Sequence, residues 1–239
     1  CNNGVTSYKG NMLCGSTKLG IDLTQLVIAP TLSYKINENN SIGVSPLIAY
    51  QMFEAQGLQM FQSTPGMSQS PNNVTNTGYD HAWGYGVRVG YYGRLTDKVS
   101  IGAAYASKVD MQSFDKYKGL FAESGDFDMP ENYNLGLAIQ ATPKLLFALD
   151  YQRINYSGVN AVGNPSTNNA LLGAGNGKGF GYSDVEVWKL GAEYAYSDRL
   201  TLRAGYSHTD NPISSRDVTF NIIAPAVIVI AHNAAFDRP

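Results

Sequence analysis

Charged side chains are scarce in this chain. Only 15% of its 239 residues are Asp, Glu, Lys or Arg, whereas about a quarter is usual in soluble globular domains. The formal net charge is −2 and the sequence pI is near 5.9, while nucleic-acid binding normally needs a basic patch. The composition therefore gives no reason to expect a nucleic-acid partner.

Long hydrophobic runs are also missing. A spanning helix needs roughly 18 consecutive apolar residues, and the longest run, FNIIAPAVIVIA at 220–231, is shorter and contains Pro225. The first residue is not Met, and the start lacks the charged and apolar regions of a signal peptide. Either a signal peptide has been removed or the chain is a fragment, and the ending AAFDRP, which is unlike a strand, favours a fragment.

Cysteine and the common catalytic motifs are scarce as well. Cys1 and Cys14 could pair as a disulfide in an oxidising compartment or remain two thiols, and both interpretations stay open. The segment GAGNGKG at 173–179 lacks the spacing of a phosphate-binding loop. The sequence has no GxSxG nucleophile motif and no calcium-loop spacing. We therefore predict no enzymatic activity, no cofactor and no metal.

What the sequence does have is repeated hairpins. Stretches of alternating apolar and polar residues, each pair joined by a tight polar turn, span 32–50, 88–107, 135–151 and 190–207. A further strand is predicted at about 217–231. The pattern gives about nine strands of roughly ten to thirteen residues, and a tilted strand crosses a bilayer in about 9–11.

The connections between hairpins differ from the turns within them. Residues 54–80, 110–129 and 158–183 are long and rich in Gly, Asn, Ser and Gln, and 210–216 is shorter. In outer-membrane barrels, tight turns face the periplasm and long loops face outside. A soluble sandwich has no reason to sort its loops in this way. The predicted fold class is therefore all-β, an antiparallel transmembrane β-barrel with long, partly helical extracellular loops.

Tyrosine is abundant, with 16 residues, and many lie near predicted strand ends. Aromatic girdles at the two membrane interfaces have that placement, so the apolar strand face is predicted to contact lipid. Nine strands would leave an unpaired edge, which a bilayer does not tolerate. We therefore expect residues 1–239 to form one partial barrel domain. The tyrosines are Tyr34, Tyr50, Tyr91, Tyr105, Tyr133, Tyr151, Tyr194 and Tyr206.

Several stretches resemble the FadL family of outer-membrane transporters, in the branch that includes aromatic-hydrocarbon transporters. They include QLVIAPTLSYKINENNSIGVSPLIAYQMF, GLFAESGDFDMPENYNLGLAIQATP and GFGYSDVEVWKLGAEYAYSDRLTLRAGYSHTDNPI, in that order along the chain. The resemblance implies a fourteen-stranded barrel of the bacterial outer membrane with an N-terminal hatch. Hydrophobic molecules would pass a groove between extracellular loops, reach a lumenal site and leave sideways into the membrane. Counterparts of the hatch, the first strands and the last strands are missing from this sequence.

Two of the long loops are unusually apolar. In the segment around 113–133, apolar residues recur three or four apart, which predicts a helical stripe ended by Gly125 and Pro130. One interpretation is that each loop folds over its own small core. The favoured one is that the two loops face each other as a ligand-binding groove. Its predicted residues are Phe53, Leu58, Met60, Phe61, Met111, Phe114, Tyr117, Leu120 and Phe121.

Strand alternation also places charged residues inside the barrel. They could form a network of ion pairs that stabilises the wall, or an excess of cations could attract a carboxylate substrate. For the second hypothesis the predicted ligands are Arg88 and Lys108. The full set is Lys35, Arg88, Lys108, Asp150, Lys189, Glu193 and Arg203.

The predicted function is passive transport of hydrophobic small molecules, either long-chain fatty acids or monoaromatic hydrocarbons, by a monomer embedded in outer-membrane lipid. One alternative is an outer-membrane enzyme such as a barrel lipase. Ser207 and His208 argue against it, because neighbours on a strand point to opposite faces. A general porin or a structural barrel is the other alternative, and the apolar loops argue against that one.

Overall fold

The computed structural model describes residues 2–11, 13 and 15–223. Short helical segments occupy the loops. They are α1 (Gln59–Ser63), η1 (Pro71–Asn73), η2 (Asp115–Tyr117), α2 (Ala122–Gly125), η3 (Tyr156–Gly158), α3 (Asn160–Gly163) and α4 (Val218–Ile223). The strands are β1 (Asn2–Ser7), β2 (Gly20–Ile28), β3 (Leu32–Asn37), β4 (Asn40–Gln56), β5 (Asp80–Thr96), β6 (Val99–Ala106), β7 (Asp110–Met111), β8 (Asn132–Thr142), β9 (Leu145–Ile154), β10 (Val185–Ser197) and β11 (Leu200–Thr209).

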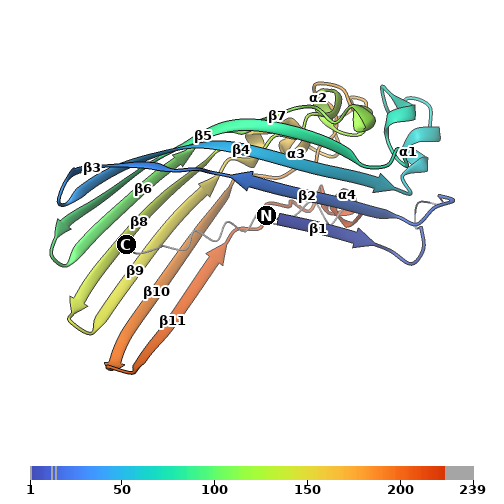
Figure 1. Ribbon diagram of the computed structural model, residues 1–239. Helices are drawn as coiled ribbons and strands as arrows, with labels where there is room; N and C mark the ends of the chain where they lie inside the picture. Colours follow the sequence, from blue (N-terminus) through green and yellow to red (C-terminus); the bar gives the residue numbers. More distant parts are fainter. Residues whose placement is uncertain (1, 12, 14, 224–239) are drawn as a thin grey trace.

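All the strands belong to one antiparallel sheet in the order β1-β2-β4-β5-β6-β8-β9-β10-β11, with β3 on β4 and β7 on β5. Figure 1 shows that the sheet curls around a concave side like part of a barrel wall. β2 and β3 both pair with β4, so they form one long strand interrupted at 29–31. Pro30 lies in the interruption, where its missing N–H costs no ladder bond. The prediction of an antiparallel all-β barrel fold is confirmed.

Short turns and long loops are sorted to opposite ends of the sheet, as predicted (Figure 1). Only two residues separate the strands of the hairpins β3–β4, β5–β6, β8–β9 and β10–β11. At the other end lie the first loop (57–79), the second loop (107–131) and the third loop (155–184). We keep these three names below.

Two predictions near the ends of the chain need correction. The predicted strand at 217–231 is wrong over Val218–Ile223, which form α4, and the rest of that range, with Pro225, lies outside the described residues. The helix starts there because the Asn221 N–H donates to the Asp217 carbonyl, 3.2 Å away. The strand β1 was not predicted, because its polar Gly- and Asn-rich sequence has no alternation and its order comes from pairing with β2. Cys1 and Cys14 lie outside the described residues.

The two faces of the sheet differ in the way the alternation predicts. On the convex face, large apolar side chains lie next to one another on neighbouring strands. For example, Leu149 of β9 pairs with Leu137 of β8 on one side and with Leu190 of β10 on the other. On the concave face the same strands carry small residues, as in Gly136 and Ala148. Because lipid-facing and lumen-facing residues alternate in outer-membrane barrels, the convex face is the one suited to lipid.

The hydrophobic core lies between the concave face of β2, β4 and β5 and the long loops. The predicted helical stripe in the second loop is wrong as a continuous helix. Glu123 and Ser124 adopt φ of 55° and 61°, and their N–H groups donate to Ala174 and Gly173 of the third loop. Bonds to another loop have replaced the bonds that a helix would make within itself.

Among the described residues, no helix is both long and apolar enough to cross a membrane.

Candidate functional site

An aromatic cluster joins the second loop to the sheet. At its centre is Phe53, fully buried on the concave face of β4. Its ring lies 4.8 Å from Phe121, 4.8 Å from Tyr117 in an edge-on arrangement, and 5.7 Å from Phe114, measured between centroids. Such tilted and edge-on pairs are the favoured aromatic geometries. Leu58, Phe61 and Val74 of the first loop belong to the same hydrophobic core. The first and second loops therefore share one core instead of each folding over its own.

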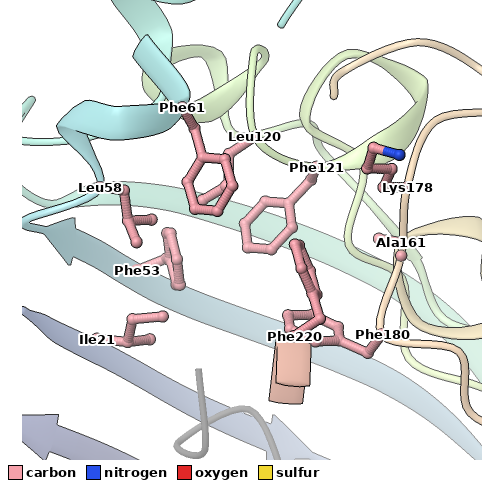
Figure 2. Close-up of a pocket in the computed structure, with 11 residues that line it drawn as sticks. Ile21, Phe53, Leu58, Phe61, Leu120, Phe121, Ala161, Lys178, Phe180 and Phe220 are labelled. Carbon is pink, nitrogen blue, oxygen red and sulfur yellow. The ribbon is translucent and has the colours of Figure 1, made fainter. Parts of the chain in front are cut away.

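Beside this cluster lies an apolar hollow, shown in Figure 2. Its volume is about 470 Å³ with the open solvent at its mouth included. Side chains from β2, β4, α4 and all three loops surround it, and Lys178 is the charged residue among them. The lining consists of Ile21, Phe53, Leu58, Phe61, Leu120, Phe121, Ala161, Lys178, Gly179, Phe180 and Phe220. We call this space the apolar hollow.

The structure separates the predicted groove residues into three groups. Phe53, Leu58, Phe61, Leu120 and Phe121 line the apolar hollow. Met111, Phe114 and Tyr117 are buried in the core and do not line it. Met60 is 38% exposed and does not line the hollow.

Six of the eleven lining residues were not anticipated from the sequence. Phe180 of the third loop and Phe220 of α4 lie 5.8 Å apart between ring centroids, and Phe220 also meets Phe61 at 6.3 Å. Figure 2 shows the Phe220 and Phe180 rings next to each other at one side of the hollow. Phe220 was assigned to a strand and Phe180 to a polar loop. Their aromatic character was the only signal, and it could not indicate which loop they would meet.

A buried carboxylate holds α4 in this place. Asp217 is fully buried and accepts hydrogen bonds from the Arg216 guanidinium (2.7 Å), the Ser214 hydroxyl (2.6 Å), and the Ser166 N–H (2.9 Å) and hydroxyl (2.7 Å). Burial opposes its ionisation, but these donors outweigh burial and hold the pKa of Asp217 well below its ordinary value. Asn221, one turn later, donates to the Phe180 carbonyl at 2.8 Å. These bonds fix the third loop against α4 and so place both phenylalanines.

Tyr117 has a structural role in the core beside the hollow. Its hydroxyl accepts a hydrogen bond from the Ala55 N–H (3.1 Å) and donates one to the Gly78 carbonyl (2.8 Å). Ala55 and Gly78 lie at the two ends of the first loop. The second loop therefore ties both ends of the first loop together through one buried hydroxyl.

Lys108 was predicted to attract a carboxylate substrate, and that role stays a prediction. Lys108 lies in the second loop, and its ammonium pairs with the buried carboxylate of Asp128. The hydrogen bond to Asp128 raises the pKa of Lys108. Asp128 also accepts a bond from the Met111 N–H at 2.7 Å. The ammonium of Lys108 is therefore paired within the second loop.

Arg88 does face the concave side of the sheet. It lines a second space, below the loops, together with Val27, Leu47, Ala106 and Ile154, and we call this space the lumenal hollow. Farther along the same face Arg203 bonds Glu193 at 2.8 Å, and Lys189 lies directly opposite Asp150. Lys35 pairs with Ser41 in the strand register. The inner charges thus include the paired network that was one of the two interpretations.

These features define a class of protein: an antiparallel β-barrel wall with an outer face suited to lipid and an apolar hollow at its loop end. Residues 2–225 match the family model described as outer membrane protein transport protein (OMPP1/FadL/TodX). The chain belongs to this family, whose place is the bacterial outer membrane, and the predicted resemblance is confirmed.

Solved structures agree on the fold. The toluene transporter TodX of P. putida superposes with a TM-score of 0.60 at 20% identity, covering 87% of this chain and 61% of that one. The toluene transporter TbuX of Ralstonia pickettii gives 0.55 at 21% identity, with 86% and 64% covered. A FadL homologue of Pseudomonas aeruginosa gives 0.57 at 18% identity, with 84% and 52% covered. The chain thus spans less than two thirds of the length of these relatives. Comparison with curated protein sequences gives no match.

Proposed function

We propose that the protein transports hydrophobic small molecules through the outer membrane by passive diffusion, and that the apolar hollow captures them at the outer surface. The observation that carries this proposal is the lining, in which five of the eleven residues are phenylalanine. Concave apolar sites are the usual form of small-molecule sites. The family description and the named relatives support transport as the class of activity.

Monoaromatic hydrocarbons are the proposed substrates. Phenylalanine rings favour tilted or edge-on contacts with another ring, and the rings of Phe61, Phe180 and Phe220 already adopt such arrangements around the hollow. A carboxylate would need a cation at the hollow. The one that lines it is Lys178, and its ammonium donates a hydrogen bond to the Asn168 carbonyl. Long-chain fatty acids are therefore the second candidate.

After capture, the molecule would move to the lumenal hollow and along the small residues of the concave face. No energy source is part of the proposal. Release into the membrane through the barrel wall, a monomeric state and contact with outer-membrane lipid complete it. A hydrolytic step is not included: in the strand register Ser207 lies opposite Lys189 and His208 opposite Trp188, which places them on opposite faces.

The test uses the full-length protein in cells that lack their own transporters of this kind. Uptake of labelled toluene and labelled oleate is compared at limiting concentration for the wild type, Phe121→Ser and Phe220→Ser. Met60→Ser is the matched control, because Met60 lies in the first loop but does not line the hollow. Correct insertion is checked by the heat-dependent electrophoretic mobility of the barrel.

We expect toluene uptake to fall about tenfold or more in both phenylalanine variants, because each loses an aromatic contact and gains a polar atom in an apolar site. The control should keep wild-type uptake. Oleate uptake with no toluene uptake would move the substrate class to fatty acids. If inserted wild-type protein takes up neither compound, the transport proposal is overturned.

A further inference from the structure

Two glutamines face each other on the concave side of the wall. Gln25 of β2 and Gln51 of β4 are directly opposite in the strand register. Gln51 has no exposed surface and Gln25 is 6% exposed. The position beside Gln51 on β5 is the buried Ala82. A polar pair is therefore embedded in an otherwise apolar part of the core.

The amide of Gln51 has no hydrogen-bond partner in the described part of the chain. This holds for both of its polar atoms, Oε1 and Nε2. A buried amide without partners is costly, and an apolar side chain of the same shape would be more stable at such a position. The stability of the fold therefore does not explain a glutamine at this position. A polar group of a ligand that forms hydrogen bonds with the amide would explain it.

The glutamine pair also lies between the two hollows. On β2 the apolar hollow touches Ile21 and the lumenal hollow touches Val27, with Gln25 between them. On β4 the corresponding residues are Phe53 and Leu47, with Gln51 between them. Side chains two apart on a strand share a face. The pair therefore lies on the stretch of this face that separates the two hollows.

We propose that Gln51, with Gln25 beside it, binds the neutral hydroxyl group of an otherwise apolar molecule as it passes. A primary amide offers donors on Nε2 and an acceptor on Oε1, and a hydroxyl group complements it by accepting one bond and donating another. A carboxylate only accepts, and a hydrocarbon does neither. The substrates selected are therefore phenols or alkanols. This inference rests on the proposed transport function and extends it to a second substrate class.

The experiment measures uptake of two molecules of nearly equal shape, labelled 4-ethylphenol and labelled ethylbenzene, by the full-length protein. The variants are Gln51→Met and Gln25→Met, which keep the length of the side chain and remove the amide. Gln140→Met is the matched control, since Gln140 lies on the same strand face at the turn end of β8 and hydrogen-bonds to the Thr142 carbonyl. The thermal unfolding midpoint of each variant is measured in parallel.

We expect Gln51→Met to lower 4-ethylphenol uptake about three- to tenfold, the effect of one or two lost neutral hydrogen bonds, and to leave ethylbenzene uptake unchanged. Gln25→Met should have a smaller effect of the same kind, and Gln140→Met none. The unfolding midpoint of Gln51→Met should equal or exceed that of the wild type, because an unpartnered buried amide has been removed.

Other outcomes separate the two proposals. Equal uptake of both compounds by wild type and Gln51→Met would overturn the inference and leave transport intact, and so would equal losses of both compounds with a lower midpoint. No uptake of ethylbenzene by the inserted wild type would overturn the transport proposal itself. If ethylbenzene enters and 4-ethylphenol does not, the assignment of a hydroxyl site is wrong.

Discussion

Asp126 in the second loop is a carboxyl group whose ionisation is coupled to the folding of the loop. Burial and the neighbouring carboxylate of Asp128 raise the pKa of Asp126 to about 7. The folded loop therefore binds a proton that the unfolded chain releases near the ordinary value of 3.8. Its contribution to stability is present at low pH and is lost as the pH rises from about 4 through about 7.

We predict that Asp126→Asn stabilises the second loop strongly at pH 8 and less at pH 5, because the amide is neutral at both values while the carboxyl loses its contribution from about pH 4 upwards. Hydrogen exchange of residues 107–131 at the two pH values measures this. Asp97→Asn, in an exposed hairpin turn, is the control and should leave the hydrogen exchange of residues 107–131 unchanged at both pH values. A variant whose protection keeps the pH dependence of the wild type would contradict the prediction.

Among single residues, the sequence indicated those whose signal is local and missed those whose state depends on a partner distant along the chain. Phe53, Phe61 and Phe121 were predictable because large apolar side chains in a polar loop or at its edge need a partner. The state of Lys108 was not predictable. Its partner, Asp128, is 20 residues away along the chain and meets it only because the loop folds back so that Val109 bridges Met129.

Among the elements, α4 depends most on a single interaction. Asp217 accepts bonds from Arg216, Ser214 and Ser166, and the last of these belongs to the third loop. We predict that Asp217→Ala lowers the free energy of local opening in 218–223 by about 2–3 kcal/mol, the usual contribution of hydrogen bonds to a charged group. Hydrogen exchange measures this. The amides of α4 and of the third loop should exchange faster.

Two comparisons make that measurement specific. Asp115→Ala removes an exposed carboxylate from the second loop and should leave α4 unchanged. The β8–β9 hairpin, far from Asp217 in the sheet order, should keep its protection in both variants. Unaltered exchange in α4 of Asp217→Ala would mean that side-chain packing, and not the carboxylate, holds the helix.

The elements also show where sequence patterns fail. Long hairpins such as β8–β9 were predicted well, because period-two alternation and a tight turn are both local signals. The helical stripe in the second loop and the strand over α4 were wrong. In both segments the deciding hydrogen bonds reach another loop, as in Ser124 to Gly173 and Asn221 to Phe180. Local periodicity cannot report such partners.

For the whole molecule, the apolar convex face is the one suited to lipid, and substitutions on the two faces test this assignment. We predict that Leu149→Arg, on that face, lowers the free energy of unfolding in lipid vesicles by up to about 2–4 kcal/mol, with the largest loss at mid-bilayer depth. Ala148→Arg, one residue away on the concave face, should cost much less. Urea titration of the full-length protein measures both. Equal losses would mean that the faces are wrongly assigned.

The regular alternation of short turns with long loops along the chain was the most informative global signal in the sequence, because it requires no knowledge of which residues contact each other. It indicated the barrel and its orientation. It could not indicate that all three loops and α4 converge on one hollow, since convergence depends on the curl of the sheet (Figure 1).

That convergence has a consequence for how the protein matures. The hollow combines Ile21 with Phe220, and the Tyr8 hydroxyl donates to the Ile222 carbonyl at 2.9 Å, so early and late parts of the chain meet there. Loops that close across so many residues form late in folding. A ligand that binds only the complete hollow would therefore stabilise the folded barrel by mass action. The time at which the loops become resistant to protease during assembly would then measure when the hollow closes.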